Sequence, residues 1–307
     1  MSFSFQNLTE IKSGLSNKKI YRKYEKRLNK IIIDFSKDEK EFFSFLNIYK
    51  ILRNINISIP KIYEIYIEQK LIVMEDFGDN SFDKIFNEKN LYYLLKISVD
   101  NLIIIQNSLI SEDLENLEKY SFNDLKKEIA EFVSYYIPYK KITDFSEDQF
   151  YEVWKNIYEN QKFEFNSFAH KDFEFINLIL LNKNKLHYKC GIIDFQSAFI
   201  GFKGWDLFSI LENPRINFTR KYNEDLIKYF YVNTNINIEY NSFRSQYYFL
   251  NLGRLTRLLG RWAKLLNQRN NNEYLDYINT SEKRIISSLS NVDSEILKKI
   301  YMKAITN

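Results

Sequence analysis

Two stretches of sequence decide the fold. They read Phe168-Ala-His-Lys-Asp-Phe-Glu-Phe-Ile-Asn-Leu178 and Gly191-Ile-Ile-Asp-Phe-Gln-Ser-Ala198. In the first, Asp172 and Asn177 lie five residues apart on what we expect to be one loop. In the second, Asp194 ends an apolar strand, seventeen residues after Asn177. The pattern therefore predicts that a short hairpin brings two carboxylates and an amide together.

These side-chain types fit the chemistry of phosphoryl transfer. The reaction needs an acceptor hydroxyl held in line with the phosphorus, and cations that neutralise the phosphates. Magnesium takes hard oxygen ligands, typically one or two carboxylates or amides together with substrate phosphate and water. An asparagine and an aspartate facing a second aspartate across a hairpin supply that set. An aspartate freed from the metal can then orient the hydroxyl and accept its proton.

Hydrophobic periodicity places this segment within a two-part chain. Before Gly78 the alternation of apolar residues predicts a small sheet with one helix, and after it the pattern is mainly helical. We therefore expect an α+β protein with a sheet-bearing lobe over residues 1–77 and a large helical lobe over residues 78–307. The expected strands are Ile20–Glu25, Lys30–Phe35, Ile62–Ile67, Lys70–Glu75, Leu178–Leu181 and Lys189–Phe195. The expected helices are Lys37–Asn54 with Ser36 as N-cap, about 90–110, 122–136 and 147–160, and further helices from Trp205 onward.

Composition narrows the class of protein. Apolar residues make up 45% of the 307 residues and charged residues 27%, as in ordinary globular proteins. The single cysteine, Cys190, excludes a disulfide framework and fits a reducing cytoplasm. The N-terminus has no signal-peptide pattern, and no apolar run is long enough to span a membrane. The net charge of +4 is too small to indicate a nucleic-acid partner.

The segment His170-Lys-Asp172, then Asn177, then Asp194 resembles the catalytic loop and metal-binding aspartate of kinases. With Ile-Ile-Asp-Phe-Gln196 and the later Gly204-Trp-Asp-Leu207, it is similar to the aminoglycoside and choline kinase-like phosphotransferases. The resemblance implies a protein-kinase-like two-lobed fold that uses ATP and Mg²⁺. It also implies roles for the matching residues: Asp172 as catalytic base, Asn177 and Asp194 as magnesium ligands, and His170 and Asp206 as braces of the catalytic loop.

Several further stretches resemble the bacterial N-acetylmuramate/N-acetylglucosamine anomeric kinases of that family. They are Tyr21-Arg-Lys-Tyr24, Leu71-Ile-Val-Met-Glu-Asp-Phe-Gly78 and the segment from Arg254 to Lys264. The resemblance thus spans nearly the whole chain. It implies that the acceptor is an amino sugar of cell-wall turnover. We expect the protein to act in the cytoplasm as a monomer or weak dimer.

The nucleotide site departs from the kinase pattern. Gly14–Lys18 contains one glycine where a glycine-rich loop is expected, and the strand Ile31–Asp34 has no lysine to hold the phosphates. Arg22, Lys23, Lys26 and Lys30 remain open as alternatives to that lysine. The resemblance places the connection between the lobes, and with it adenine binding, at Met74 to Phe77, so that Glu75, Asp76 and Phe77 are candidates for the nucleotide site.

The acceptor side also departs from the sugar kinases. Glu174 stands where they usually carry a histidine, and Ile176 stands where they carry a basic residue. Glu174, Gln196 and Arg254 are the candidate acceptor-binding residues. Arg254, Arg257 and Arg261 share one helical face, which either lines the acceptor site or faces solvent. Choline, ethanolamine or an aminoglycoside is the alternative acceptor, and a nucleotide-binding pseudokinase scaffold is the alternative to an enzyme.

Overall fold

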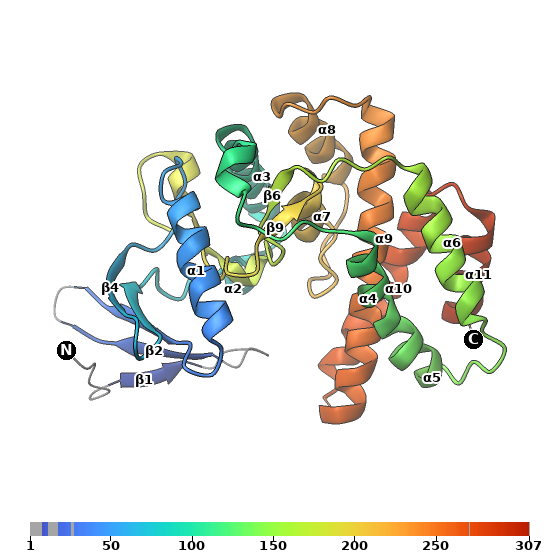
Figure 1. The fold of residues 1–307 in the computed structure, drawn as a ribbon, viewed down its shortest axis with the longest axis horizontal. Coiled ribbons are helices and arrows are strands. Elements are labelled where there is room, and N and C mark those ends of the chain that lie inside the picture. The colour runs from blue at the N-terminus through green and yellow to red at the C-terminus, as the bar shows by residue number, and fades with distance from the viewer. Residues whose placement is uncertain (1–7, 12–17, 26–27, 270, 307) are drawn as a thin grey trace. The chain divides into compact units, whose positions relative to one another are not determined.

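A computed structural model describes residues 8–11, 18–25, 28–269 and 271–306 (Figure 1). The chain divides into two compact units. Unit 1 comprises Met1–Leu117 and His170–Ala198, and unit 2 comprises Glu118–Ala169 and Phe199–Asn307. Unit 1 therefore contains Asp172, Asn177 and Asp194 together with the N-terminal residues. The lobe boundary at Gly78 stays a prediction.

Among the described residues of unit 1, five strands form an antiparallel sheet. Its order is β1 (Leu8–Ile11), β2 (Lys19–Lys23), β3 (Lys30–Asp34), β5 (Leu71–Glu75) and β4 (Ile62–Tyr66). The two predicted hairpins are confirmed, whereas β1 was not foreseen. Isoleucines dominate β3, and Ile32, paired with Val73 of β5, is fully buried. Such β-branched residues fit a pleated, covered surface.

Helix α1 (Glu39–Leu52) is amphipathic and buries Phe42, Phe45, Ile48 and Leu52. The rings of Phe42 and Phe45 pack against Phe35 at the end of β3. The predicted N-cap at Ser36 is wrong. The carboxylate of Asp38 accepts the N–H of Glu41 at 2.9 Å, while the N–H of Ser36 donates to Asp34 in the preceding turn. Asp38 is as strong a capping residue as serine and lies next to the first helical residue.

The remainder of unit 1 surrounds a short hairpin. Strands β7 (Leu178–Leu180) and β8 (Cys190–Ile192) pair antiparallel, as predicted. Helix α3 (Leu91–Ser108) contacts β8, and its buried Asn101 donates to the carbonyl of His187 at 3.0 Å. The other elements are α2 (Phe82–Ile85) and the 3₁₀ turns at Ser111–Leu114, Phe175–Asn177 and Leu186–Lys189.

Unit 2 is mainly helical and is organised around α9 (Tyr240–Arg269), 30 residues long (Figure 1). Helices α4 (Phe122–Glu131) and α10 (Glu273–Leu289) pack along α9. The other elements are a π-helical turn at Phe132–Tyr136, α5 (Ile137–Tyr139), α6 (Glu147–Asn160), α7 (Trp205–Leu211), α8 (Asn223–Asn233), α11 (Glu295–Thr306), and the paired strands β6 (Ser167–Ala169) and β9 (Phe199–Gly201). Within the described ranges, no helix has the length and apolar character that a membrane span requires.

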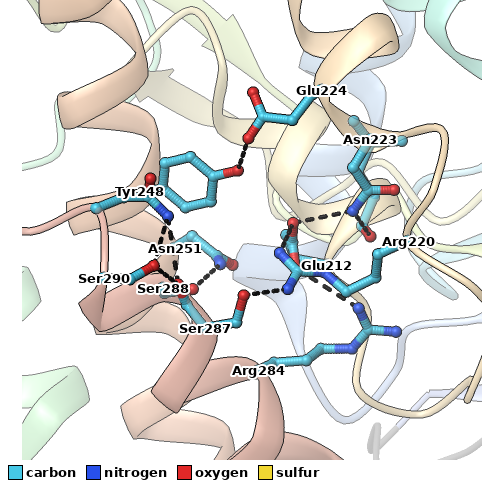
Figure 2. Close-up of polar contacts among 12 residues, drawn as sticks. Glu212, Arg220, Asn223, Glu224, Tyr248, Asn251, Arg284, Ser287, Ser288 and Ser290 are labelled. Atoms are coloured by element: carbon cyan, nitrogen blue, oxygen red, sulfur yellow. Dashed lines mark hydrogen bonds and ion pairs between the residues drawn. The ribbon is translucent and has the colours of Figure 1, made fainter.

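A buried polar network stabilises unit 2 (Figure 2). Glu212, fully buried at the end of α7, accepts hydrogen bonds from Arg220 at 2.6 Å and from Asn223 at 2.9 Å. The guanidinium of Arg284, from α10, lies 3.5 Å from the same carboxylate. Removing the charge of Glu212 would leave two guanidinium groups without their counter-ion in the interior. We therefore interpret this network as structural.

Gly260 allows α9 to approach the chain at the junction of α4 and the π-helical turn. A Cβ atom at this position would lie 2.2 Å from the carbonyl carbon of Glu131 and 2.5 Å from the amide nitrogen of Phe132. The side chains beside this contact are also paired, because Arg261 donates to the carboxylate of Glu131 at 2.9 Å. Gly253, earlier on the same helix, faces only side chains, the nearest being Leu125 at 2.6 Å.

We expect Gly260→Ala to lower the free energy of unfolding by about 3 kcal/mol, since backbone atoms must move to admit the methyl group. Gly253→Ala is the matched control. Its methyl group meets the flexible end of Leu125 and gains helix propensity, so its stability should stay within about 1 kcal/mol of wild type. Urea unfolding followed by circular dichroism measures both values. Equal values for the two variants would contradict the close backbone contact.

Candidate active site

The β7–β8 hairpin brings the two predicted magnesium ligands to the same end of unit 1. Leu178 pairs with Ile192, so Asn177 immediately precedes one strand and Asp194 follows the other. The N–H of Ile193 extends this pairing by donating to the carbonyl of Asn177 at 3.1 Å. Since these are backbone hydrogen bonds, they fix the positions of the Asn177 and Asp194 main chains relative to each other.

The loop that carries Asp172 is closed by hydrogen bonds to its own backbone. The carbonyl of Asp172 accepts the N–H of Glu174 and the Nδ2–H of Asn177, each at 2.9 Å. The N–H of Asn177 donates to the carbonyl of Glu174 at 2.8 Å. With its Nδ2 engaged in this way, Asn177 keeps its Oδ1 oxygen for a ligand, and no described residue donates to that oxygen. The loop therefore holds Asp172 and Asn177 in one fixed arrangement.

Two residues of the site have left-handed backbone conformations. Lys171 has φ of 76° and Asp194 has φ of 64°. Each such conformation costs about 1–3 kcal/mol in a residue other than glycine, and it persists only where surrounding contacts impose it. Lys171 directly precedes the predicted base Asp172, and Asp194 is itself a predicted magnesium ligand. Backbone strain here is consistent with a site built for function.

The carboxylate of Asp194 faces a cation supplied by the chain itself. Lys18, immediately before β2, donates from its ammonium group to Asp194 Oδ1, and Gln196 Nε2 donates to the same oxygen at 3.1 Å. Burial alone would raise the pKa of Asp194, but the charge and hydrogen bond of Lys18, together with Gln196, lower that pKa below its usual value. Asp194 therefore stays ionised and able to bind a cation.

Helix α1 connects this ion pair to the rest of unit 1. Glu41 Oε1 lies 3.6 Å from the Lys18 ammonium nitrogen. One turn on, Ser44 Oγ donates to the carbonyl of Gln196 at 2.6 Å, and the ring of Phe45 stacks on Phe195 at 4.7 Å. One face of α1 therefore contacts both Lys18 and the loop after Asp194. Our sequence analysis did not identify Lys18 as a site residue.

The basic residues considered for the phosphates have other partners. Arg22 donates to Asp76 at 3.0 Å and to Asp79 at 2.9 Å. Lys23 and Lys30 lie 3.1 Å and 3.2 Å from Glu25 on the same hairpin. Lys26 and Gly14–Asn17 lie outside the described residues.

The predicted connection between the lobes begins where β5 ends, at Glu75. The N–H of Gly78 donates to Asp76 Oδ1 at 2.8 Å, which closes a tight turn, and Gly78 has φ of 81°. This φ favours glycine over any residue with a side chain. The ring of Phe77 lies against Gly191 of β8, where a Cβ atom would come within 2.6 Å of it. Asp76 thus links the end of β5 to Arg22, and Phe77 links it to the β7–β8 hairpin.

Metal binding is consistent with the oxygen ligands present. Among the described residues no cluster of three or more His, Cys, Asp or Glu side chains could hold a metal ion. Magnesium does not require one, since it commonly uses one or two protein ligands together with substrate phosphates and water. The Oδ1 of Asn177 and the ionised carboxylate of Asp194, which already binds a cation, are suitable ligands.

Four of the remaining predicted residues are buried. Glu174 and Gln196, in unit 1, are 4% and 6% exposed, and Gln196 directs its amide to Asp194. Asp206, in the first turn of α7, and Arg254, in α9, belong to unit 2 and are each 2% exposed. Arg257 and Arg261, on the same face of α9, pair with Glu128 and Glu131. The roles of Glu174, Gln196, Asp206 and Arg254 stay predictions.

His170 has no exposed surface, and its Nε2–H donates to the carbonyl of Ile193 at 3.2 Å. This bond ties the start of the loop that carries Asp172 to the residue before Asp194. Burial disfavours the imidazolium ion and lowers the pKa of His170 to about 4, although the charge of Asp194 acts in the opposite direction. At neutral pH the side chain is therefore a neutral hydrogen-bond donor that braces the loop.

The buried His170 should make stability depend on pH. Its folded-state pKa lies below the unfolded value of about 6.5, so the unfolded chain binds the extra proton and stability falls as pH drops from 6.5 toward 4. The full loss is about 3 kcal/mol, from 1.36 kcal/mol per pKa unit. His170→Asn should be less stable than wild type at pH 7, and the difference should shrink by pH 5 in urea titrations.

His187→Asn is the matched control, since His187 is the only other histidine of the chain and lies outside this loop. A stability difference between wild type and His170→Asn that stays constant from pH 7 to pH 5 would contradict the assignment.

Comparisons with known proteins bear on the fold of the chain. No protein-family model matches the chain. It is 24% identical over 236 residues to an N-acetylmuramate/N-acetylglucosamine kinase of Caulobacter vibrioides, a match that covers 72% of this chain and 63% of that protein. The match therefore spans less than two thirds of the length of this relative.

Solved structures match over more of the chain. A choline kinase from Streptococcus pneumoniae superposes with a TM-score of 0.61 at 14% identity, over 92% of this chain and 95% of that one. The chain has a protein-kinase-like fold. A spectinomycin phosphotransferase in complex with ADP and spectinomycin has the same fold, with a TM-score of 0.56 at 14% identity over 97% of this chain and 92% of that one. The predicted kinase-like fold, with a small antiparallel sheet and a mainly helical remainder, is thus confirmed.

Proposed function

We propose that this protein is an ATP- and magnesium-dependent kinase that phosphorylates a hydroxyl group of a small molecule. The observation that carries the proposal is the arrangement of Asp172, Asn177 and Asp194 on two loops joined by backbone hydrogen bonds. The kinase-like fold and the kinase relatives support it. Lys18 and the ionised Asp194 argue against a degenerate pseudokinase, since the charges that phosphate binding needs are in place.

Each residue of the loops has a distinct role in this mechanism. Asn177 and Asp194 would hold magnesium, which when bound neutralises the nucleotide phosphates. Asp172 orients the acceptor hydroxyl and takes its proton as the oxygen bonds to the γ-phosphorus. The bond from that phosphorus to the bridging oxygen breaks, and ADP leaves with its electron pair. Neutral His170 keeps the loop in place and does not take the proton.

The nucleotide would use the end of β5. Backbone groups from Glu75 to Phe77 follow a sheet strand and are held by the Asp76 turn and by the packing of Phe77. We propose that they bind adenine. Arg22, paired with Asp76, would support this segment.

The acceptor is proposed to be an amino sugar of the N-acetylmuramate or N-acetylglucosamine type. Support comes from the 24% identical relative that bears this name. Glu174, Gln196 and Arg254 are the proposed acceptor-binding residues. Choline is the second candidate, because the choline kinase matches the fold over nearly the whole of both chains. With the first candidate, we propose that the protein acts in cell-wall recycling in the cytoplasm, as a monomer or weak dimer.

The decisive assay measures ADP release with Mg²⁺-ATP and a panel of acceptors: N-acetylmuramate, N-acetylglucosamine, glucosamine, choline, ethanolamine and kanamycin. We expect turnover of an amino sugar by the wild type. Asp172→Asn should lower kcat by about 10²–10⁴-fold, the usual contribution of a positioned base. Asp148→Asn, on the exposed side of α6, is the matched control and should retain full activity.

Turnover of choline in place of the sugars would reassign the acceptor and leave the kinase proposal intact. ADP release that is equal in wild type and Asp172→Asn for every acceptor would refute the proposed role of Asp172.

A further inference from the structure

We propose that Lys18 is the residue that binds the ATP phosphates, in place of the lysine that is missing from Ile31–Asp34 of β3, and that it pairs with Asp194 until magnesium and nucleotide bind. This inference rests on the proposed kinase function and names a residue of its nucleotide site. It differs from the alternatives considered from sequence, which were Arg22, Lys23, Lys26 and Lys30.

The position of Lys18 is unusual for a lysine. Its side chain is only 4% exposed, whereas lysines are almost never buried unless they are paired. Its partners come from distant parts of unit 1: Asp194 lies 176 residues further along the chain, and Glu41 belongs to α1. Burying the Lys18 side chain costs conformational entropy and desolvation of its charge. The attraction of the ammonium group to the carboxylates of Glu41 and Asp194 offsets these costs.

Exposure increases from Lys18 to its partners. The side chain of Lys18 is 4% exposed, Glu41 20% and Asp194 33%. Asp194 is thus the open side of the group, and a ligand that reaches its carboxylate also reaches the ammonium ion bound to it. The three side chains together carry one net negative charge. This balance suits the arrival of a divalent cation together with phosphate oxygens better than the arrival of either alone.

In this proposal Lys18 exchanges one partner for another. Without ligand, Lys18 serves as the counter-ion of Asp194. With magnesium bound at Asp194 that role is filled, and Lys18 donates to a phosphate oxygen instead. Glu41, 3.6 Å from the ammonium nitrogen, keeps the lysine in place during the exchange. Ser44 and Phe45 hold the loop after Asp194 to α1, the helix that carries Glu41. The positions of Glu41 and Asp194 relative to each other are therefore maintained.

Three other described basic residues of the first hairpin, Arg22, Lys23 and Lys30, pair with other carboxylates. Lys23 and Lys30 pair with Glu25 on the hairpin itself, and Lys23 is 42% exposed. Arg22 donates to Asp76 and Asp79. Lys18 alone among Lys18, Arg22, Lys23 and Lys30 pairs with a proposed magnesium ligand.

Isothermal titration of the full chain with Mg²⁺-ATP, and separately with adenosine, tests the proposal. We expect Lys18→Ala to weaken Mg²⁺-ATP binding about 10- to 100-fold, the contribution of a charged hydrogen bond, and to leave adenosine binding unchanged because adenosine has no phosphates. Lys18→Arg should recover part of the loss. Lys19→Ala, the exposed neighbour on β2, is the matched control and should bind both ligands as wild type does.

Adenosine binding also reports that the nucleotide site is folded, and Lys18→Gln replaces any alanine variant that fails this check. Wild-type affinity for Mg²⁺-ATP in both Lys18→Ala and Lys18→Gln would overturn the role of Lys18 while leaving the kinase proposal standing. A wild-type protein that binds neither Mg²⁺-ATP nor adenosine would overturn the proposed function, and the role of Lys18 with it.

Discussion

The backbone pairing of β7 with β8 is the constraint on which the candidate site depends. It places Asn177 and Asp194 at one end of a hairpin, and the hydrogen bond from Ile193 to Asn177 carries the pairing to the residue before Asp194. His170 binds the carbonyl of that same Ile193, so the catalytic loop is held to the hairpin as well. Each of these contacts uses a backbone carbonyl, so the main chain sets the positions of the residues that we propose for the site.

Ion pairs around Lys18 also organise unit 1. Partial burial disfavours the charged form of a carboxylate, yet Asp194 keeps its charge because Lys18 and Gln196 donate to it. Helix α1 then secures both sides of this pair through Glu41, Ser44 and Phe45. The fold thus stores a compensating cation within the chain, and the cost of desolvating Lys18 is offset by two carboxylates. In unit 2, the buried carboxylate of Glu212 is likewise paired with cations, those of Arg220 and Arg284. None of these three residues is a proposed catalytic residue.

The sequence could predict the parts of the structure that depend on local patterns of residues. The two hairpins and α6 follow from alternation and helical periodicity, and the loop from His170 to Asn177 is a contiguous motif. The pairing of Lys18 could not be predicted, because its partners lie far away along the chain and no local pattern distinguishes a buried lysine from an exposed one. The N-cap at Ser36 was wrong because Asp38 competed for the same role two residues later. The π-helical turn at Phe132–Tyr136 was also missed, since its hydrophobic spacing differs too little from that of an α-helix.

The left-handed backbone of Asp194 has an evolutionary consequence. Asparagine is one of the few residues that share the tolerance of aspartate for this conformation, and it has nearly the same shape. A change from Asp to Asn at this position would remove the charge that we propose binds magnesium and would leave the backbone undisturbed. A descendant of this protein could therefore lose the proposed activity in one step, keep its fold, and remain available for selection as a binding protein.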